Sequence, residues 1–178
     1  SEIATWFKGD NGTWKVEDGQ LKMSGGITGA IMRVIPRREF SDDYVVWVDT
    51  EWISGEENST YGIFYGASNG RGYGFNISAS GGFIVSRWDG KEENVSVPIY
   101  DWKGHSSIAK NGKNRLRIDV AGFKHTYYIN SIAVASIVDS TYSDGRVGIG
   151  VSALQQVAFD NLSVAERSPL LKPIVTSQ

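Results

Sequence analysis

The sequence of 178 residues contains no cysteine, only two histidines and only four prolines. The absence of cysteine excludes disulfides, thiolate metal sites and a cysteine nucleophile. Neither His105 nor His125 has a second ligand at metal-binding spacing, which argues against a histidine-based zinc site. The chain must therefore rely on its core for stability and on other polar side chains for its chemistry.

Long apolar runs and a dominant charge are also missing. No segment approaches the roughly 18 consecutive apolar residues of a membrane-spanning helix. The formal net charge of -2 gives no electrostatic reason to expect nucleic acid or an anionic membrane as a partner. Residues 1–13 carry no basic and apolar leader, so we expect any export signal to have been removed or to lie outside this sequence.

What the sequence does contain is enough apolar material for one large core. Hydrophobic residues make up 40% of the chain, and 12% of it is aromatic. A chain of this length fits one domain that buries about 70% of the surface it exposes when unfolded. Pro169 and Pro173 interrupt the last segment, so we predict a single domain over 1–165. A tail, or a linker to other domains, would follow over 166–178.

Apolar and polar residues alternate with a period of two along most of the chain. Residues 116–120 show this pattern, and so do residues 73–77 and 147–151. Such alternation is typical of strands with one buried and one exposed face. Turn dipeptides such as Asp18-Gly19 separate these runs. About ten short strands with frequent turns predict an all-β, antiparallel, two-sheet jelly-roll sandwich.

A glycine pair predicts how two of these strands meet. A two-residue turn at Gly81-Gly82 would set Asn76 opposite Arg87. One face of this hairpin would then be apolar and would hold Tyr73, Phe75, Ile77, Ile84 and Trp88. The other face would hold Asn76, Ser78, Val85 and Arg87. The assignment depends on the turn type, because a slip of one residue exchanges the two faces.

The strand over 44–52 offers a second polar face. Val46 and Val48 point one way, whereas Trp47, Asp49 and Glu51 point the other. A flat aromatic ring can stack on the C–H face of a sugar, carboxylates accept protons from hydroxyls, and an arginine adds planar donors. The predicted sugar-binding residues are Trp47, Asp49, Glu51, Asn76 and Arg87. The alternative is that the tryptophan packs across strands and the carboxylates are simply solvated.

Eight segments between Tyr61 and Val164 carry a resemblance to a known family. They are 61–65 (YGIFY), 72–77 (GYGFNI), 87–90 (RWDG), 114–116 (NRL), 128–130 (YIN), 139–141 (DST), 145–148 (GRVG) and 159–164 (FDNLSV). With the hairpin over 14–23, the chain resembles concanavalin A-like lectin/glucanase jelly-roll domains of the 3-keto-disaccharide hydrolase group, which are laminin-G-like and β-glucanase-like.

The resemblance implies two curved sheets with a glycan on a concave face. It also implies a bacterial domain that is secreted, periplasmic or on the cell surface. Because this fold hosts several roles, function has to be argued from the site. We expect a non-catalytic carbohydrate-binding module whose partner is an oligo- or polysaccharide. One alternative is a glycoside hydrolase-like enzyme acting on a β-glucan or a 3-keto-disaccharide, and another is an adhesion or spacer domain that contacts protein.

The catalytic alternative depends on paired carboxyl groups, which glycoside hydrolysis normally needs. Related β-glucanases place them on one strand as Glu-x-Asp-x-Glu. Here the nearest match is residues 47–51 (WVDTE), with Trp47 at the position of the nucleophilic glutamate. An enzyme would therefore have to use Asp49 and Glu51 as its acid and base.

The last strand holds a candidate calcium ligand, although no cofactor is required. The apolar phase shifts between Phe159 and Leu162, which predicts a β-bulge at Asp160-Asn161. In similar jelly-roll glucanases an aspartate of this strand helps to bind a structural calcium, so the resemblance implies Asp160. The alternative is that Asp160 accepts backbone N–H bonds at the bulge.

Overall fold

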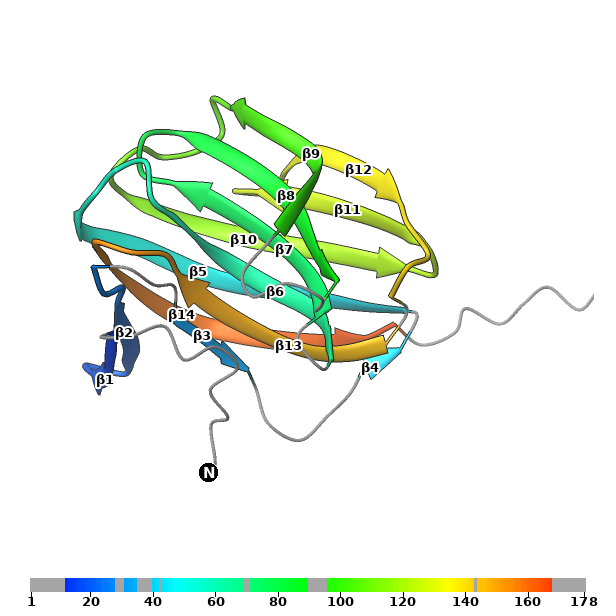
Figure 1. Ribbon diagram of the computed structural model, residues 1–178, viewed down its shortest axis with the longest axis horizontal. Coiled ribbons are helices and arrows are strands. Elements are labelled where there is room, and N and C mark those ends of the chain that lie inside the picture. Colours follow the sequence, from blue (N-terminus) through cyan, green and yellow to red (C-terminus); the bar gives the residue numbers. More distant parts are fainter. Residues whose placement is uncertain are drawn as a thin grey trace, which may run out of the picture.

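The computed structural model describes residues 12–27, 31–34, 40–41, 43–68, 71–89, 96–142 and 144–167. They form fourteen β-strands in two antiparallel sheets that pack face to face (Figure 1). The predicted fold class is thus confirmed. The described residues include no helix with the length and apolar character needed to cross a membrane.

The front sheet faces the viewer in Figure 1. In spatial order it consists of β3 (Ile31–Val34), β13 (Asp144–Val151), β6 (Thr60–Ser68), β7 (Arg71–Ser78), β8 (Gly82–Asp89) and β9 (Ser96–Gly104). The short strand β4 (Phe40–Ser41) also pairs with β13. Strands β6 to β9 follow one another in the chain, so side chains from these four consecutive strands share this sheet.

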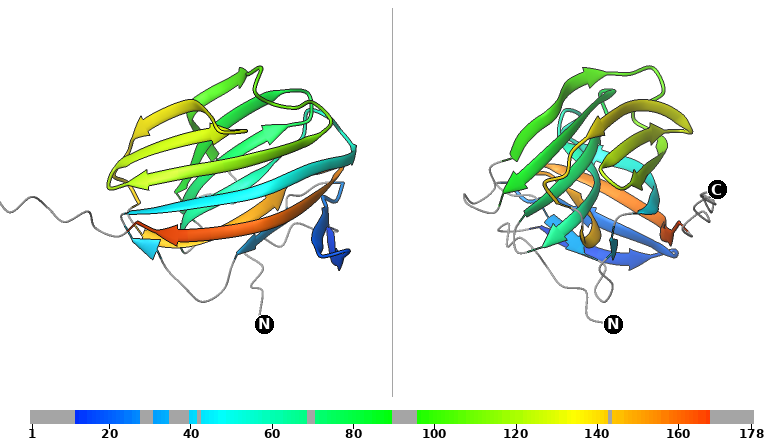
Figure 2. Two further views of the ribbon diagram at one scale, coloured as in Figure 1. Left: turned by 180° about the vertical axis from the view of Figure 1, so that it is seen from behind. Right: turned by 90° about the vertical axis from the view of Figure 1, so that its right-hand side faces the viewer.

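The back sheet is seen from behind in the left view of Figure 2. In spatial order it consists of β1 (Thr13–Glu17), β2 (Gln20–Ser24), β14 (Gln155–Glu166), β5 (Asp43–Gly55), β10 (Lys113–Ala121), β11 (Lys124–Ile129) and β12 (Ile132–Val138). The chain passes between the sheets several times, which gives each sheet strands from distant parts of the sequence.

The alternating apolar residues fill the space between the two sheets. Val46 and Val48 point inward from β5, and Phe75 and Ile77 point inward from β7. Five tyrosines are buried with them: Tyr44, Tyr61, Tyr65, Tyr73 and Tyr127. Burying a large apolar side chain contributes about 1.5–3 kcal/mol. The core therefore fixes which residues face outward from each sheet.

The turn predicted at Asp18-Gly19 is present between β1 and β2. Glu17 pairs with Gln20, so Asp18 and Gly19 form a two-residue connection between β1 and β2. Both have positive φ, at 54° and 78°. Asp followed by Gly is the pair that tolerates this conformation, which confirms the predicted turn.

The predicted register of β7 and β8 is wrong. Asn76 lies opposite Ile84, three residues from the expected partner Arg87, because the connection spans 78–82. The Oγ of Ser78 accepts the N–H of Gly82 at 3.1 Å and tightens this longer loop. Backbone bonds to Glu57 and His105 also anchor it to neighbouring segments. Since the shift is odd, every residue of β8 lies on the face opposite to the predicted one.

The predicted domain boundary falls close to the end of β14 at Glu166. Residues 168–178 lie outside the described residues, so the tail or linker over 166–178 stays a prediction.

Candidate functional site

Three of the predicted site residues lie on the outer face of the back sheet. Trp47, Asp49 and Glu51 alternate along β5 with buried residues, as the sequence predicted. In the neighbouring strand β10, Arg115 is opposite Asp49 and Lys113 is opposite Glu51. This face therefore brings acidic and basic side chains together in pairs.

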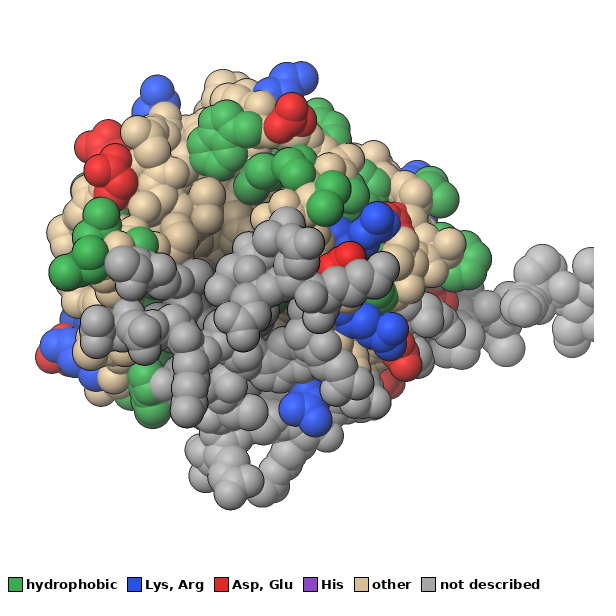
Figure 3. Space-filling view, viewed as in Figure 1, with side chains coloured by type: hydrophobic (Ala, Val, Ile, Leu, Met, Phe, Trp, Pro, Cys, Tyr) green, Lys and Arg blue, Asp and Glu red, His purple; other side chains and the backbone are tan. Residues whose placement is uncertain are grey.

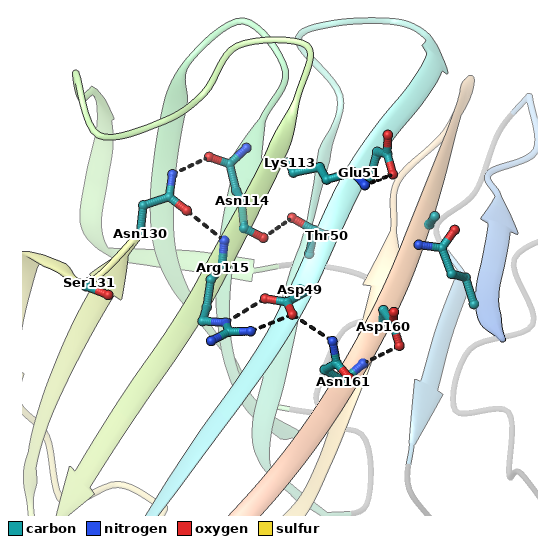
Figure 4. A pocket seen from close by; sticks show the side chains of 12 residues that line it. Asp49, Thr50, Glu51, Lys113, Asn114, Arg115, Asn130, Ser131, Asp160 and Asn161 are labelled. Atoms are coloured by element: carbon teal, nitrogen blue, oxygen red, sulfur yellow. Dashed lines mark hydrogen bonds and ion pairs between the residues drawn. The ribbon is translucent and has the colours of Figure 1, made fainter.

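Asp49 lies in a pocket of about 520 Å³ on this face (Figure 4). The residues that line it are Gln20, Asp49, Thr50, Glu51, Lys113, Asn114, Arg115, Asn130, Ser131, Ala158, Asp160 and Asn161. Arg115 donates to both carboxylate oxygens of Asp49, each at 2.6 Å, and Asn161 Nδ2 donates to Oδ2 at 2.9 Å. The hydrogen bonds from Arg115 hold the pKa of Asp49 below its usual range, despite partial burial.

The amides of Asn114 and Asn130 in this pocket are satisfied by the protein itself. Asn114 Oδ1 accepts the N–H of Ala109 at 2.8 Å, and its Nδ2 donates to the Ala109 carbonyl at 3.0 Å. Asn130 Nδ2 donates to Asn114 Oδ1 at 2.9 Å, and its Oδ1 accepts the N–H of Arg115 at 2.8 Å. These groups can stabilise the back sheet without a ligand, because each has a partner.

The same geometry argues against Asp49 as a catalytic acid. A carboxyl with a lowered pKa and a bidentate arginine partner stays ionised near neutral pH. Glu51 is itself near a cation, with Lys113 Nζ at 3.4 Å. The strand therefore supplies two carboxylates that each face a basic residue.

Trp47 faces a neighbouring pocket of about 410 Å³. This pocket is lined by Val45, Trp47, Arg115, Arg117, Ser131 and Ala165. Arg117 forms two hydrogen bonds with Asp119 and lies over the ring of Tyr128, 5.0 Å from its centroid. Trp47 thus shares the outer face of the back sheet with Asp49 and Glu51. The arginine beside it, Arg117, is already paired with Asp119.

Arg87 does not join this group. The observed register sets it opposite Tyr73, on the core-facing side of the front sheet. Its Nη1 donates to Asp139 Oδ2 at 2.7 Å and to Thr141 Oγ1 at 2.8 Å, while the hydroxyl of Tyr73 donates to Asp139 Oδ1 at 2.8 Å. Arg87 therefore fixes the connection between β12 and β13, and the prediction that it shares a wet face with Asn76 is wrong.

Asn76 lies on the outer face of the front sheet, next to two glycines on the same face. It is opposite Gly62, and Gly74 beside it is opposite Phe64 on β6. A Cβ atom added to Gly74 would lie 2.5 Å from Cη2 of Trp88 and 2.9 Å from Nδ2 of Asn76. The indole ring and the amide therefore meet above Gly74, on the side away from the core.

Figure 3 looks onto this outer face, whose described part shows a recess, with hydrophobic side chains gathered along the β9 side. Ser86 is opposite Gly74 and points to the same side, and the rings of Phe64 and Trp88 lie 5.1 Å apart. We name this site the front hollow and define it by Phe64, Gly74, Asn76, Ser86 and Trp88.

The front hollow contains polar groups without partners. Asn76 is only 6% exposed and Ser86 only 3%, yet neither side chain forms a hydrogen bond within the described residues. The enclosed side-chain atoms without a partner in the described residues are Trp52 Nε1, the Tyr61 hydroxyl and Gln155 Oε1, so the polar atoms of Asn76 and Ser86 still reach the surface. Nearly buried polar groups without a protein partner call for an explanation such as a bound ligand or water. The front hollow is therefore the candidate functional site.

Sequence reasoning missed the aromatic part of this site. It assigned Trp88 to the core because of the wrong β8 register, and it gave Phe64 no role. A signal was present: Gly62, Gly74, Gly148 and Gly150 lie on one face of three neighbouring strands. Glycine inside a strand often marks a place where another group approaches the backbone closely.

Asp160 lies at the predicted bulge. The pairing of β14 with β5 shifts after Asp160, and Asn161 has a φ of 54°. Asp160 Oδ1 accepts the N–H of Asn161 at 2.7 Å, as the alternative interpretation expected. Calcium takes six to eight oxygen ligands. No three acidic or histidine side chains gather as a metal site in the described part of the chain, and Asp160 as a calcium ligand stays a prediction.

Comparisons with known proteins show the fold but no sequence family. No family model and no curated protein matches this chain. The carbohydrate-binding module CBM66 from Bacillus subtilis is similar in structure, with a TM-score of 0.74, 19% identity, and coverage of 88% of this chain and 92% of that one. A Bacillus subtilis protein with a galectin-like fold matches with a TM-score of 0.63 and 13% identity, over 87% of each chain.

A galectin extends the comparison to animals. The galectin LEC-6 of Caenorhabditis elegans has a TM-score of 0.51 and 15% identity, over 72% of this chain and 89% of that one. None of these structures assigns the chain to the 3-keto-disaccharide hydrolase group, which stays a prediction. The chain has a galectin-like, concanavalin A-like β-sandwich whose structural neighbours include carbohydrate-binding modules, galectins and glycosyl hydrolases.

Proposed function

We propose that this domain is a non-catalytic carbohydrate-binding module that holds a glycan in the front hollow. The observation that carries the proposal is the nearly buried amide of Asn76, which forms no hydrogen bond with a described residue and lies beside the indole ring of Trp88. An amide can both donate to and accept from sugar hydroxyls. A sugar bound there would supply the partners that Asn76 lacks.

The rest of the hollow has the matching chemistry. An aromatic ring offers a flat apolar surface to the C–H face of a sugar, and Trp88 is only partly buried. Ser86 adds a hydroxyl that can donate or accept. The glycine positions keep the floor low, so a ring can approach the backbone. Binding sites of this kind combine apolar walls with a few placed polar groups.

The fold supports a sugar as the ligand. CBM66, which is similar over 88% of this chain, is named as a carbohydrate-binding module. We extend that role to this domain and, from the same resemblance, propose that it acts outside the cytoplasm. The glycan-binding roles predicted for Trp47, Asp49 and Glu51 would place a ligand on the back sheet instead, where Asp49 already pairs with Arg115 and Glu51 lies near Lys113.

The front hollow does not favour catalysis. None of its five residues is a carboxylic acid, whereas glycoside hydrolysis normally needs two. Asp49 and Glu51 lie on the opposite sheet, and Asp49 is held by Arg115. No observation favours the hydrolase or the adhesion alternative over binding.

A glycan screen with two matched tryptophan variants tests the proposal. We expect the wild-type domain to bind a subset of neutral glycans on an array. Trp88→Ala is expected to lower the affinity for the best of them at least about tenfold, or ~1.4 kcal/mol, because the stacking surface is lost. Isothermal titration calorimetry measures the affinity, and circular dichroism checks that the variant is folded.

Trp47→Ala is the control on the back sheet. It removes a partly exposed tryptophan from the other outer face and should leave the affinity unchanged. Loss of binding in Trp47→Ala with retention in Trp88→Ala would move the site to the back sheet. An array without any bound glycan would refute the proposed function.

A further inference from the structure

A second tryptophan lies on the same outer face as the front hollow. Gly82 at the start of β8 pairs with Gly104 at the end of β9. A Cβ atom added to Gly82 would lie only 2.1 Å from Cζ2 of Trp102, so this ring covers Gly82. The next residue, Phe83, is fully buried and points into the core. Gly82 and Trp102 therefore lie on the outward side, which Ser86 and Trp88 share by alternation along β8.

Trp102 forms the wall of a pocket of its own. The pocket has a volume of about 460 Å³ and is lined by Ser80, Gly81, Gly82, Trp102, Gly104, His105, Ser106 and Lys110. The side chain of Trp102 remains exposed, at 44%. Lys110 lays its aliphatic chain against Gly81, and its ammonium forms no ion pair with a described residue. The pocket thus offers a flat ring and an available donor, which is the pairing that the front hollow also has.

The spacing of the two tryptophans sets the size of the ligand. The ring of Trp88 lies above Gly74, which is opposite Ser86, and the ring of Trp102 lies above Gly82. Ser86 and Gly82 are four residues apart on β8, which corresponds to about 13 Å at 3.3 Å per residue. Ile84 lies between them on the same face. This distance exceeds the width of one sugar ring, so a monosaccharide cannot contact both tryptophans.

We infer that the domain binds an extended, linear oligosaccharide along β8, with one sugar ring in the front hollow and a distant ring stacked on Trp102. The inference rests on the proposed function and adds the class of glycan, which is a chain of several linked rings. Lys110 donates to hydroxyls of the distant ring. A segment of a polysaccharide therefore binds better than its terminal sugar alone.

The experiment compares short and long chains of one glycan. Affinity gel electrophoresis with a soluble β-glucan, a xylan, a galactan and a fructan first identifies which polymer the wild-type domain binds. Calorimetry with the disaccharide to hexasaccharide series of that polymer then gives affinity against length. We expect the affinity to rise with length, and Trp102→Ala to lower it about tenfold for the hexasaccharide while leaving the disaccharide unchanged.

Two further variants separate the role of the Trp102 ring from that of Trp88. Trp102→Phe retains a flat ring and should preserve most of the hexasaccharide affinity, whereas Trp88→Ala should weaken every length. Equal affinities for all lengths, with no effect of Trp102→Ala, would overturn the inference and leave the proposed function intact. Failure of the wild-type domain to bind any of the polymers or any array glycan would overturn both.

Discussion

Replacing Asn76 with leucine is expected to make the domain more stable and to abolish most of its glycan binding. Leucine branches at Cγ as asparagine does, and it removes the nearly buried amide that has no partner in the described residues. Relief of that desolvation cost should raise the free energy of unfolding by about 1 kcal/mol. Loss of the hydrogen bonds to sugar hydroxyls should lower the affinity at least about tenfold.

A second buried asparagine provides the matched control. Asn114 is 2% exposed, but its amide has partners on both sides. Asn114→Leu leaves these partners unsatisfied, so it should lower the free energy of unfolding by about 2–3 kcal/mol. Urea unfolding of both variants and calorimetry with the best array glycan measure the effects. Destabilisation by Asn76→Leu with unchanged affinity would mean that Asn76 serves the fold and not a ligand.

Acidification from pH 7.5 to pH 4.5 is expected to destabilise the domain by about 2–3 kcal/mol through one histidine. His125 is 2% exposed, and burial lowers its pKa from 6.5 to about 4, an effect that the charge of Asp139 only partly offsets. Its Nδ1 is 2.9 Å from the hydroxyl of Tyr65. As the pH falls below 6.5, the unfolded chain binds a proton that the folded domain does not, so stability is lost until the folded pKa is reached.

Between pH 7.5 and 4.5 the loss of stability through His125 is separate from the titration of Asp139 and Asp49. The pKa of Asp139 and that of Asp49 lie below their usual range, so their stabilising contributions are lost only below about pH 4. His125→Phe should remove most of the pH dependence between 7.5 and 4.5, and His105→Gln should retain it. Urea unfolding at the two pH values measures the difference. An equal loss of stability in wild type and His125→Phe would show that another group titrates.

The sequence predicted the strands well because alternation is a local property. The face of β5 that carries Trp47, Asp49 and Glu51 points away from the core as expected, and Asn76 also lies on an outer face. The bulge at Asp160 was visible as a change of apolar phase. Each of these predictions needed only neighbouring residues.

The composition of the site could not be predicted in the same way. Alternation gives the face of a strand, but it does not say to which sheet the strand belongs, and β5 and β7 are in different sheets. The register of β8 depends on backbone bonds from the 78–82 loop to Glu57 and His105, which are distant in the sequence. Those contacts outweigh the local preference of Gly81-Gly82 for a tight turn. Arg87 and Trp88 exchanged roles for that reason.

An NMR titration with the best-binding oligosaccharide tests most directly whether the glycan lies in the front hollow. We predict that the largest changes in amide chemical shift occur at Gly74, Asn76, Ser86 and Trp88, together with the indole N–H of Trp88. Changes confined to Asp49, Arg115 and Asn161 on the back sheet would contradict it.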